Sequence, residues 1–206
     1  MQRERTHHAN TYNRKAQTLL LTGAIGGGKT TQMERLINSL RRKDEPWKIF
    51  PEISRELQTL INPETKEPVY NPSQDPNTFT NAILERRIDD YDFAVQNRIN
   101  IYDRGLIDSL AFCRAYGGKN EDQLLQLCQQ KPYDLIIFFP FWEEIYEQDD
   151  GRCETPTQAK YISNHIHKVL LDLNVNFTTI PKDTPEARHL FVLQQIRTIS
   201  PHQRLL

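Results

Sequence analysis

The sequence lacks any apolar run long enough to cross a membrane. Its longest such run, residues 135–142, has eight residues and contains Pro140, whereas a spanning helix needs about 20. An excess of charge of either sign is also missing, because 26 Lys and Arg against 27 Asp and Glu leave a formal net charge of −1. We therefore expect no membrane span, and neither nucleic acid nor an anionic membrane as a partner.

Cysteine is scarce as well. The three thiols, Cys113, Cys128 and Cys153, are odd in number and lack the CxxC spacing of a zinc or redox site. The chain also lacks the features of a targeting signal, because residues 1–15 are polar and the apolar stretch 19–21 is too short. These absences predict reduced thiols and a cytoplasmic location.

Glycine is rare but unevenly distributed. Four of the eight glycines lie at residues 23–28, in the segment GAIGGGKT of residues 23–30. This segment matches the P-loop pattern GxxxxGK[ST] in full. A short β-type run, Gln17–Thr22, precedes it, and residues 31–40 follow with apolar side chains at helical spacing. A strand, a glycine loop and a helix are the setting that a P-loop requires.

The residue types of this segment suit a polyphosphate. Glycines let successive N–H groups turn toward the phosphates at the positive end of a helix. Lys29 would bridge the β- and γ-phosphates and the Thr30 hydroxyl would bind Mg²⁺. The expected nucleotide-binding residues are Gly23, Gly26, Gly27, Gly28, Lys29, Thr30 and Thr31. The alternative is an ordinary glycine-rich turn between a strand and a helix.

Strands and helices alternate along the rest of the chain. We expect strands at 17–22, 47–50, 98–103, 134–139 and 175–180. We expect helices at 31–40, 54–61, 78–97, 106–116, 121–129, 158–173 and 185–199. This alternation predicts a single α/β domain over residues 17–199, a P-loop NTPase with a parallel sheet of about five strands and helices on both faces. Residues 62–76 form an exposed Pro-rich loop, 143–157 a lid-like loop, and 1–16 and 200–206 polar tails.

Ligands of such sheets bind beyond the carboxyl ends of the strands. Asp103 ends a predicted strand and suits a Mg²⁺ partner or a base, and its neighbour Arg104 could reach a phosphate. Glu52 ends another strand and could accept a proton from a substrate hydroxyl. Arg152, in the acidic lid-like loop, could close over the site. We therefore predict Lys29, Glu52, Asp103, Arg104 and Arg152 as catalytic residues, and Thr30 and Asp103 as metal ligands.

Each of these assignments has a structural alternative. Asp103 could cap the helix that follows it, Arg104 could form a surface ion pair, Glu52 could start a helix, and Arg152 could be solvated. Asp108 and Arg55 stay open between structural and functional roles. A similar choice holds for Arg86 and Arg87 on the helix 78–97, which could contact an acceptor or lie on an exposed helical face.

Residues 102–112, YDRGLIDSLAF, resemble the Asp-Arg segment of P-loop nucleoside and nucleotide kinases. The likeness is strongest to the predicted ATPase family related to the ribosylnicotinamide-kinase domain of a bacterial NAD regulator. That resemblance includes PEISREL at 51–57 and WEEIY at 142–146, and it extends over about residues 17–196. The sequence departs from thymidylate kinases at Gly105, where they carry Tyr.

The resemblance implies a role for each matching residue. Lys29 and Thr30 would hold a triphosphate and Mg²⁺, and Arg104 would contact a donor or acceptor phosphate. Asp103 would organise metal or nucleophile and Glu52 would face the acceptor hydroxyl. Arg152 would be the arginine of the lid.

These observations predict a transfer of the γ-phosphoryl group of Mg-ATP to a small acceptor, either a nucleoside, a nucleotide or a ribosyl compound. The alternative is a slow ATPase or GTPase switch acting on a protein partner, although the Asn-Lys-x-Asp motif for guanine is absent. A non-catalytic scaffold is a third hypothesis, and the intact Lys29 and Thr30 argue against it. We do not expect an oligomeric AAA+ motor, because the chain has no room for its additional helical domain, whereas a homodimer is an option.

Overall fold

A computed structural model describes residues 16–40, 47–70, 74–146 and 155–199. Most of the expected N-terminal tail, the C-terminal tail, Arg152, Cys153 and the central part of the lid-like loop lie outside these residues. Within them, Cys113 and Cys128 are free thiols. No helix in the described part of the chain is both long and apolar enough to cross a membrane.

Five parallel strands form one sheet in the order β2-β3-β1-β4-β5. The strands are β1 (Gln17–Thr22), β2 (Trp47–Phe50), β3 (Ile99–Asp103), β4 (Leu135–Phe138) and β5 (Thr178–Thr179). The central strand β1 places Leu21 opposite Asp103 of β3 and Ile137 of β4. The predicted parallel α/β sheet of five strands is confirmed.

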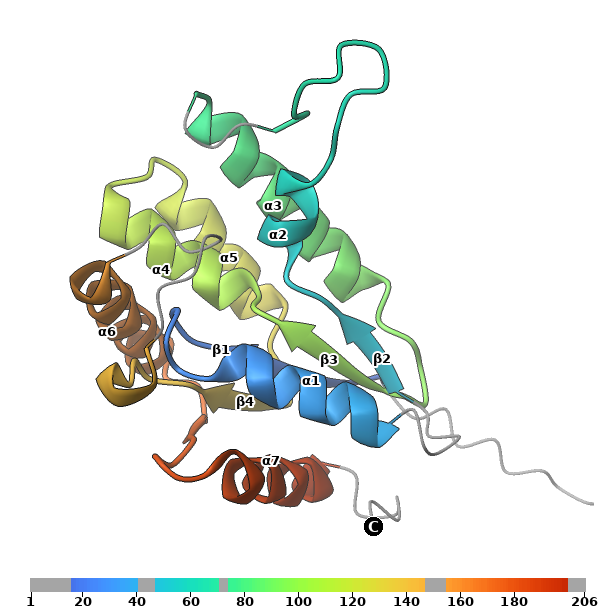
Figure 1. Cartoon of the computed structure of the whole chain (residues 1–206), viewed down its shortest axis with the longest axis vertical. Coiled ribbons are helices and arrows are strands. Elements are labelled where there is room, and N and C mark those ends of the chain that lie inside the picture. Colours follow the sequence, from blue (N-terminus) through green and yellow to red (C-terminus); the bar gives the residue numbers. More distant parts are fainter. Residues whose placement is uncertain (1–15, 41–46, 71–73, 147–154, 200–206) are drawn as a thin grey trace, which may run out of the picture.

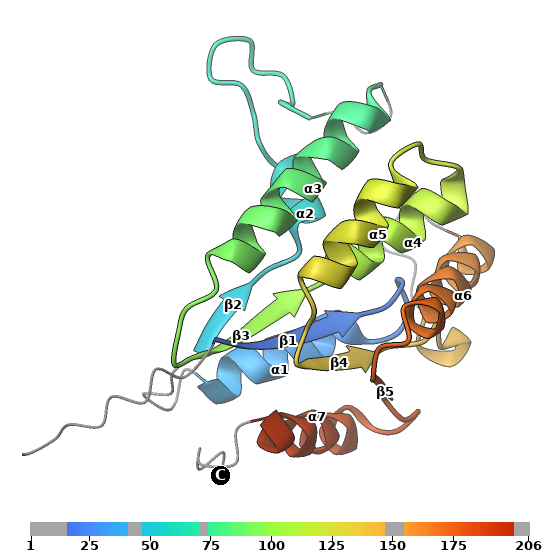
Figure 2. The same cartoon turned by 180° about the vertical axis from the view of Figure 1, so that it is seen from behind.

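Helices cover both faces of the sheet (Figures 1 and 2). They are α1 (Lys29–Leu40), α2 (Ile53–Gln58), α3 (Pro76–Asp92), α4 (Leu106–Tyr116), α5 (Glu121–Gln130), α6 (Pro156–Asp172) and α7 (Pro185–Ile199), with a 3₁₀ turn η1 (Glu143–Ile145). Alternate side chains of β1 pack on opposite faces. Leu19 and Leu21 pack with side chains of α1 and α7, whereas Leu20 packs with side chains of α4 and α6. The central strands are therefore buried on both faces, as their apolar runs indicate.

Helix α3 begins and ends earlier than the expected 78–97. Its start is fixed by Asp75, whose carboxylate accepts a hydrogen bond from Thr78 N at 3.0 Å, and by Pro76 at the first helical position. Beyond Asp92 the chain turns, because the side chain of Asn100 binds both backbone groups of Val95. Pro76 thus belongs to a helix and not to the expected loop.

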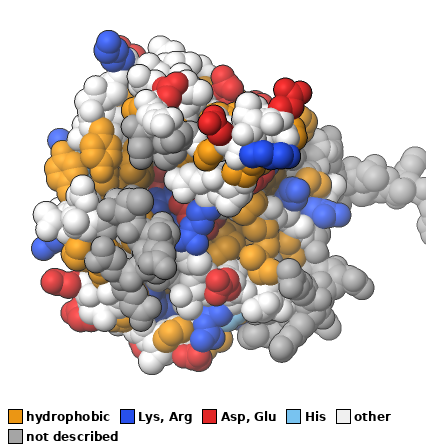
Figure 3. Space-filling model, turned by 45° about the horizontal axis from the view of Figure 1, so that its top comes forward, with side chains coloured by type: hydrophobic (Ala, Val, Ile, Leu, Met, Phe, Trp, Pro, Cys, Tyr) orange, Lys and Arg blue, Asp and Glu red, His pale blue; other side chains and the backbone are white. Residues whose placement is uncertain are grey.

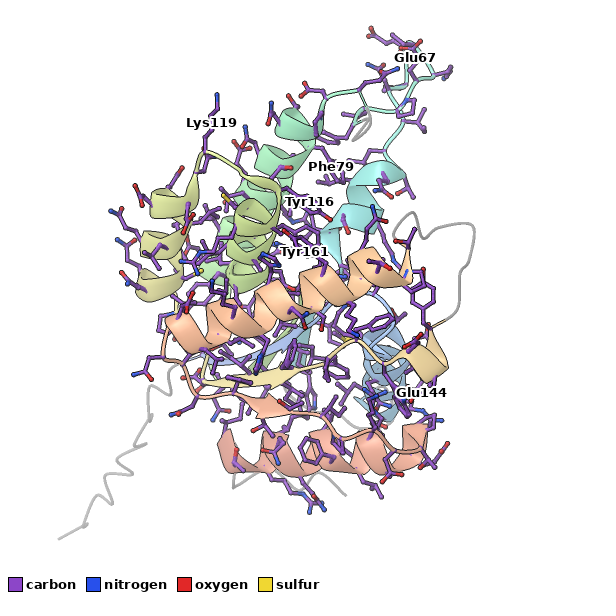
Figure 4. The ribbon with its side chains drawn as sticks, turned by 90° about the vertical axis from the view of Figure 1, so that its left-hand side faces the viewer. Glu67, Phe79, Tyr116, Lys119, Glu144 and Tyr161 are labelled. Carbon is purple, nitrogen blue, oxygen red and sulfur yellow. The ribbon has the colours of Figure 1, made fainter. Side chains whose placement is uncertain are left out.

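Helix α2 is also shorter than the expected 54–61. It ends at Gln58, and residues 59–70 leave the body of the molecule as a projecting segment (Figures 1 and 2). An antiparallel bridge between Ile61 and Pro68 closes this segment, which carries Glu67 near its tip (Figure 4). Strand β5 is likewise only two residues of the expected 175–180, since it lies at the sheet edge and pairs with β4 alone.

Candidate active site

The glycine loop lies between the end of β1 and the first residue of α1, Lys29. Gly26 and Gly28 have φ values of 81° and 75°, a region that L side chains rarely adopt. A Cβ on Gly28 would also lie 2.5 Å from Nη1 of Arg188. The loop therefore needs glycine for both its backbone conformation and its close contacts, as the P-loop pattern indicates.

A cleft of about 870 Å³ opens beside this loop. One end is lined by the P-loop together with Trp142 and the start of α7, and Thr30 and Thr31 both contribute to it. The other end is lined by α2, α3 and α4. Figure 3 shows acidic and basic side chains close together near the middle of one face, with apolar side chains on either side. Ligand pockets in proteins measure about 300–1,000 Å³, so the cleft can hold a large ligand or two smaller ones.

Lys29 and Asp103 form an ion pair between Nζ and Oδ1. Both side chains are buried, at 5% and 7% exposure. Their approach follows from the sheet, because β3 is the direct neighbour of β1 and carries Asp103 at its end. Lys29 lines the cleft whereas Asp103 lies behind it. In this state the lysine covers the carboxylate.

Arg104 is buried and linked to two carboxylates. Its Nε lies 2.8 Å from Oε1 of Glu52, and its Nη1 lies 3.5 Å from Oδ1 of Asp108. The Nη1 atom also donates a hydrogen bond to the carbonyl of Gly23 at 2.8 Å. Arg104 has a φ of 68°, which is rare for a residue with a side chain and marks a constrained position. The arginine thus connects the second strand's end to the P-loop and is not a surface ion-pair residue.

Asp108, which the sequence left open, is fully buried. It accepts hydrogen bonds from the Thr22 hydroxyl and from Gly105 N, each at 2.9 Å. These bonds attach the start of α4 to the end of β1. Asp108 therefore acts on the site by holding its backbone in place.

Glu52 has both carboxylate oxygens engaged. Oε1 accepts from Arg104 and from the Ser54 hydroxyl, and Oε2 lies 3.3 Å from Nε of Arg55. Burial alone would raise the pKa of Glu52, but Arg104 and Lys29 outweigh it and hold this pKa well below its usual range. The side chain is thus a firmly ionised hydrogen-bond acceptor and a weak base.

Arg188 enters the site from α7 and was not among the residues predicted from the sequence. Its Nη2 donates to the carbonyl of Gly27 at 2.5 Å, and its guanidinium lies 5.4 Å from the ring centre of Trp142 and 5.5 Å from that of Phe139. Only 4% of the residue is exposed. Its Nε finds no hydrogen-bond partner in the part of the chain that the structure describes. An arginine in the first turn of a helix gives no sequence pattern from which this inward position could have been predicted.

The two arginines of α3 divide between surface and cleft. Arg86 is partly exposed and pairs with Glu56 and Asp90. Arg87 is buried, lines the cleft, and donates from Nη1 to the Ser109 hydroxyl at 2.6 Å. The cleft end that holds Arg87 also holds Phe79, which lies beside α2 on the inner side of α3 (Figure 4).

Thr30 and Asp103, the predicted metal ligands, carry side-chain oxygens, the donor type that Mg²⁺ prefers. Mg²⁺ is usually held by one or two protein oxygens together with substrate phosphates and water. Among the described residues no group of three or more His, Cys, Asp or Glu side chains could hold a metal alone. The donor set therefore fits a metal that arrives with a nucleotide.

The structure brings together Lys29, Glu52, Asp103 and Arg104 in or directly beside one cleft, with the P-loop glycines, Thr30 and Thr31 along its wall. Arg152 lies outside the described residues. The catalytic and binding roles of these residues stay predictions, whereas their proximity is a structural finding.

Two solved structures of kinases and one of the NadR protein share this fold. A deoxyadenosine kinase from M. mycoides with bound dATP is 14% identical, with a TM-score of 0.61 over 87% of this chain and 99% of that one. Thymidylate kinase from Candida albicans is 17% identical, with a TM-score of 0.58 over 92% and 94%. The NadR protein in complex with NR is 14% identical, with a TM-score of 0.60 over 91% of this chain and 52% of that one.

These likenesses establish the fold of P-loop nucleoside and nucleotide kinases. Among curated protein sequences no match is found. A family model described as AAA domain matches residues 18–188, from β1 to Arg188. With most of its length matched by that model, the chain belongs to this AAA domain family and has a P-loop kinase-like fold.

Proposed function

We propose that the chain is an ATP-dependent phosphotransferase that moves the γ-phosphoryl group of Mg-ATP to a small acceptor, a nucleoside, nucleotide or ribosyl compound. The observation that carries the proposal is that one cleft joins the P-loop to Glu52, Arg104 and Arg87. A hydrolase needs only the P-loop end, which binds the phosphate donor. A transferase needs both a donor end and an acceptor end in the same cleft.

At the donor end the backbone amides of the P-loop and the Lys29 ammonium would bind the phosphates. Lys29 would then exchange its contact with Asp103 for one with the β- and γ-phosphates. This movement would free the Asp103 carboxylate from its ion pair. Mg²⁺ held there with the nucleotide would neutralise charge on the transferred group.

Arg104 and Glu52 lie where the donor and acceptor ends meet. The Arg104 guanidinium is fixed by Glu52 and by the Gly23 carbonyl, so it would stabilise developing charge without reorganising. Phosphoryl transfer passes through a loose transition state in which positioning and charge neutralisation do most of the work. Strong general-base catalysis is not required of Glu52.

A slow ATPase or GTPase switch that acts on a protein partner is the second candidate. The ion pairs of the two candidate bases favour this alternative, because Glu52 is paired with two arginines and Asp103 with Lys29. A water molecule in this cleft would therefore find no free carboxylate base among these two. Such an enzyme would hydrolyse its nucleotide slowly.

The two candidates differ in where the phosphoryl group goes. Incubation with ATP labelled in the γ-phosphate, Mg²⁺ and a panel of nucleosides, nucleoside monophosphates and ribosylnicotinamide would separate them, with Lys29→Ala as the control. Labelled organic product that depends on Lys29 supports the transferase. Labelled free phosphate as the sole product, at a rate unaffected by every acceptor, supports the switch.

The proposed partners are the nucleotide, ATP or GTP, and the acceptor. We also expect a cytoplasmic protein. A homodimer stays an option, which sedimentation of the purified chain would test.

A further inference from the structure

We propose that the acceptor carries a phosphate group and that Arg87 binds it. The inference rests on the proposed phosphotransferase and narrows its acceptor from nucleosides, nucleotides and ribosyl compounds to phosphate monoesters. It follows from an unbalanced charge at the acceptor end of the cleft.

Arg87 is a buried cation that forms no ion pair with any carboxylate of the described residues. Its side chain is 7% exposed, Nη1 donates to the Ser109 hydroxyl at 2.6 Å, and Nε has no hydrogen-bond partner. No carboxylate of the described residues lies within 4.0 Å of it. Arg104 is buried to the same degree, at 8%, but contacts both Glu52 and Asp108. An unpaired buried charge is costly, so the position of Arg87 indicates an anion that the chain itself does not supply.

The charges at this end of the cleft also leave a positive excess. Three arginines line it, Arg55, Arg87 and Arg104, against two carboxylates: Glu52, which lines the same end, and the buried Asp108, which lies near enough to act electrostatically on Arg87. Glu52 is already shared between Arg55 and Arg104. A neutral nucleoside would leave the excess positive charge in place, whereas a phosphate dianion would compensate it.

Ser109 gives the proposed site a second donor. Its hydroxyl lines the cleft and accepts from Arg87, so the hydroxyl proton is available for a phosphate oxygen. The guanidinium fork of Arg87 matches two oxygens of a phosphate. Arg87 of α3 and Ser109 of α4 both line this end of the cleft, so two helices supply donors there.

A phosphate acceptor also fits the weak basicity of Glu52, because its reaction needs no base. A hydroxyl nucleophile loses a proton during transfer, and the oxygens of Glu52 are held by Arg104, Ser54 and Arg55. A phosphate monoester is largely ionised at neutral pH, since its second pKa is about 6. Its oxygen would form a bond to the γ-phosphorus of ATP while the bond to the β,γ-bridging oxygen breaks. ADP leaves with that electron pair, the product is a diphosphate, and no proton has to be removed.

The test is equilibrium binding of matched pairs, in the presence of Mg²⁺ and a non-hydrolysable ATP analogue. The pairs are adenosine and AMP, guanosine and GMP, cytidine and CMP, thymidine and dTMP, and ribosylnicotinamide and its 5′-phosphate. Because hydrogen bonds to charged groups contribute about 1.5–3 kcal/mol, we expect at least one monophosphate to bind about tenfold or more tightly than its own nucleoside. A panel in which no monophosphate binds more tightly than its nucleoside, including one in which nothing binds, would overturn the inference.

Variants of the two arginines on α3 test whether Arg87 causes the preference for the monophosphate over the nucleoside. Arg87→Gln should remove it, whereas Arg86→Gln, which changes the neighbouring arginine outside the cleft, should leave it unchanged. If Arg87→Gln does not fold, as judged by its thermal unfolding, Arg87→Lys keeps the charge without the fork and should lower the preference by a smaller factor. A preference that persists in the folded Arg87 variant would contradict the assignment of Arg87.

The outcome is separable from that of the proposed function. Labelled transfer to a nucleoside with equal affinity for its monophosphate would sustain the transferase and overturn the phosphate site. A monophosphate preference that depends on Arg87, without transfer to any acceptor, would sustain the phosphate site and remove the transferase.

Discussion

Lys29 and Asp103, which are 74 positions apart in the sequence, form a buried ion pair beside the P-loop. The pair joins the first residue of α1 to the last residue of β3. Under the proposed function a nucleotide would draw the lysine away from this partner, and the contact would then link nucleotide binding to the exposure of a carboxylate. Four predictions test this account of the site.

The first prediction concerns stability. Lys29→Met removes the cation and leaves Asp103 buried without its partner, which should lower the free energy of unfolding by about 3–5 kcal/mol. Adding Asp103→Asn to Lys29→Met should restore much of this loss, because a neutral amide costs less to bury. Denaturant unfolding of both variants measures the effect, and equal stability of the two would contradict the pair. Both variants lack the Lys29 ammonium, so both should bind nucleotide more weakly than the wild type.

The second prediction separates binding from turnover. Asp103→Asn and Arg104→Ala should each lower turnover by about a hundredfold or more, on the scale measured when one charge-stabilising group is removed. The affinity for ATP should fall by a much smaller factor, because we propose that both side chains act at the transfer position. Steady-state kinetics with nucleotide-binding titrations provide the two numbers. Equal losses of turnover and of ATP affinity would assign the two residues to nucleotide binding alone.

The third prediction concerns Arg188. Arg188→Gln removes the guanidinium from the Gly27 carbonyl and from the Trp142 ring, so the P-loop should be less well held. We expect nucleotide affinity to fall about tenfold, which corresponds to about 1.4 kcal/mol. Arg197→Gln changes an exposed arginine on the same helix and serves as the control. Calorimetric titration with ATP would show no difference between the two variants if Arg188 had no such role.

The fourth prediction follows from the lowered pKa of Glu52. A carboxyl whose pKa is lower in the folded than in the unfolded chain stabilises the fold above its unfolded value, about 4.3, and loses this contribution as the pH falls toward the folded value. Glu52→Gln should therefore destabilise the protein at pH 7, and the difference from the wild type should shrink below about pH 4.3. Unfolding curves between pH 3 and 7 measure this, and a difference independent of pH would contradict it.

Local patterns were sufficient to predict the P-loop and the central sheet. The GAIGGGKT segment has a fixed spacing because its backbone conformation requires glycine, and Gly26 and Gly28 adopt such conformations. The buried strands have apolar runs on both faces, so their positions were predictable too. Asp103 and Glu52 followed from the rule that ligands bind beyond the strand ends.

Tertiary contacts explain what the sequence did not reveal. Arg188 and Arg87 are arginines on helices, and the local pattern does not distinguish them from the partly exposed Arg86. Their burial is decided by Trp142 and Ser109, which lie in other elements. The end of α3 likewise depends on Asn100, a residue of the next strand.

The fate of the γ-phosphoryl group in a single turnover distinguishes a phosphotransferase from a hydrolase. Enzyme in excess over labelled Mg-ATP, mixed with the acceptor panel, would be quenched over time and its label divided between organic product and free phosphate. For a phosphotransferase we expect most of the label to reach one acceptor in the wild type and none to do so in Lys29→Ala. Label that appears as free phosphate alone, at the same rate with and without acceptors, would contradict it.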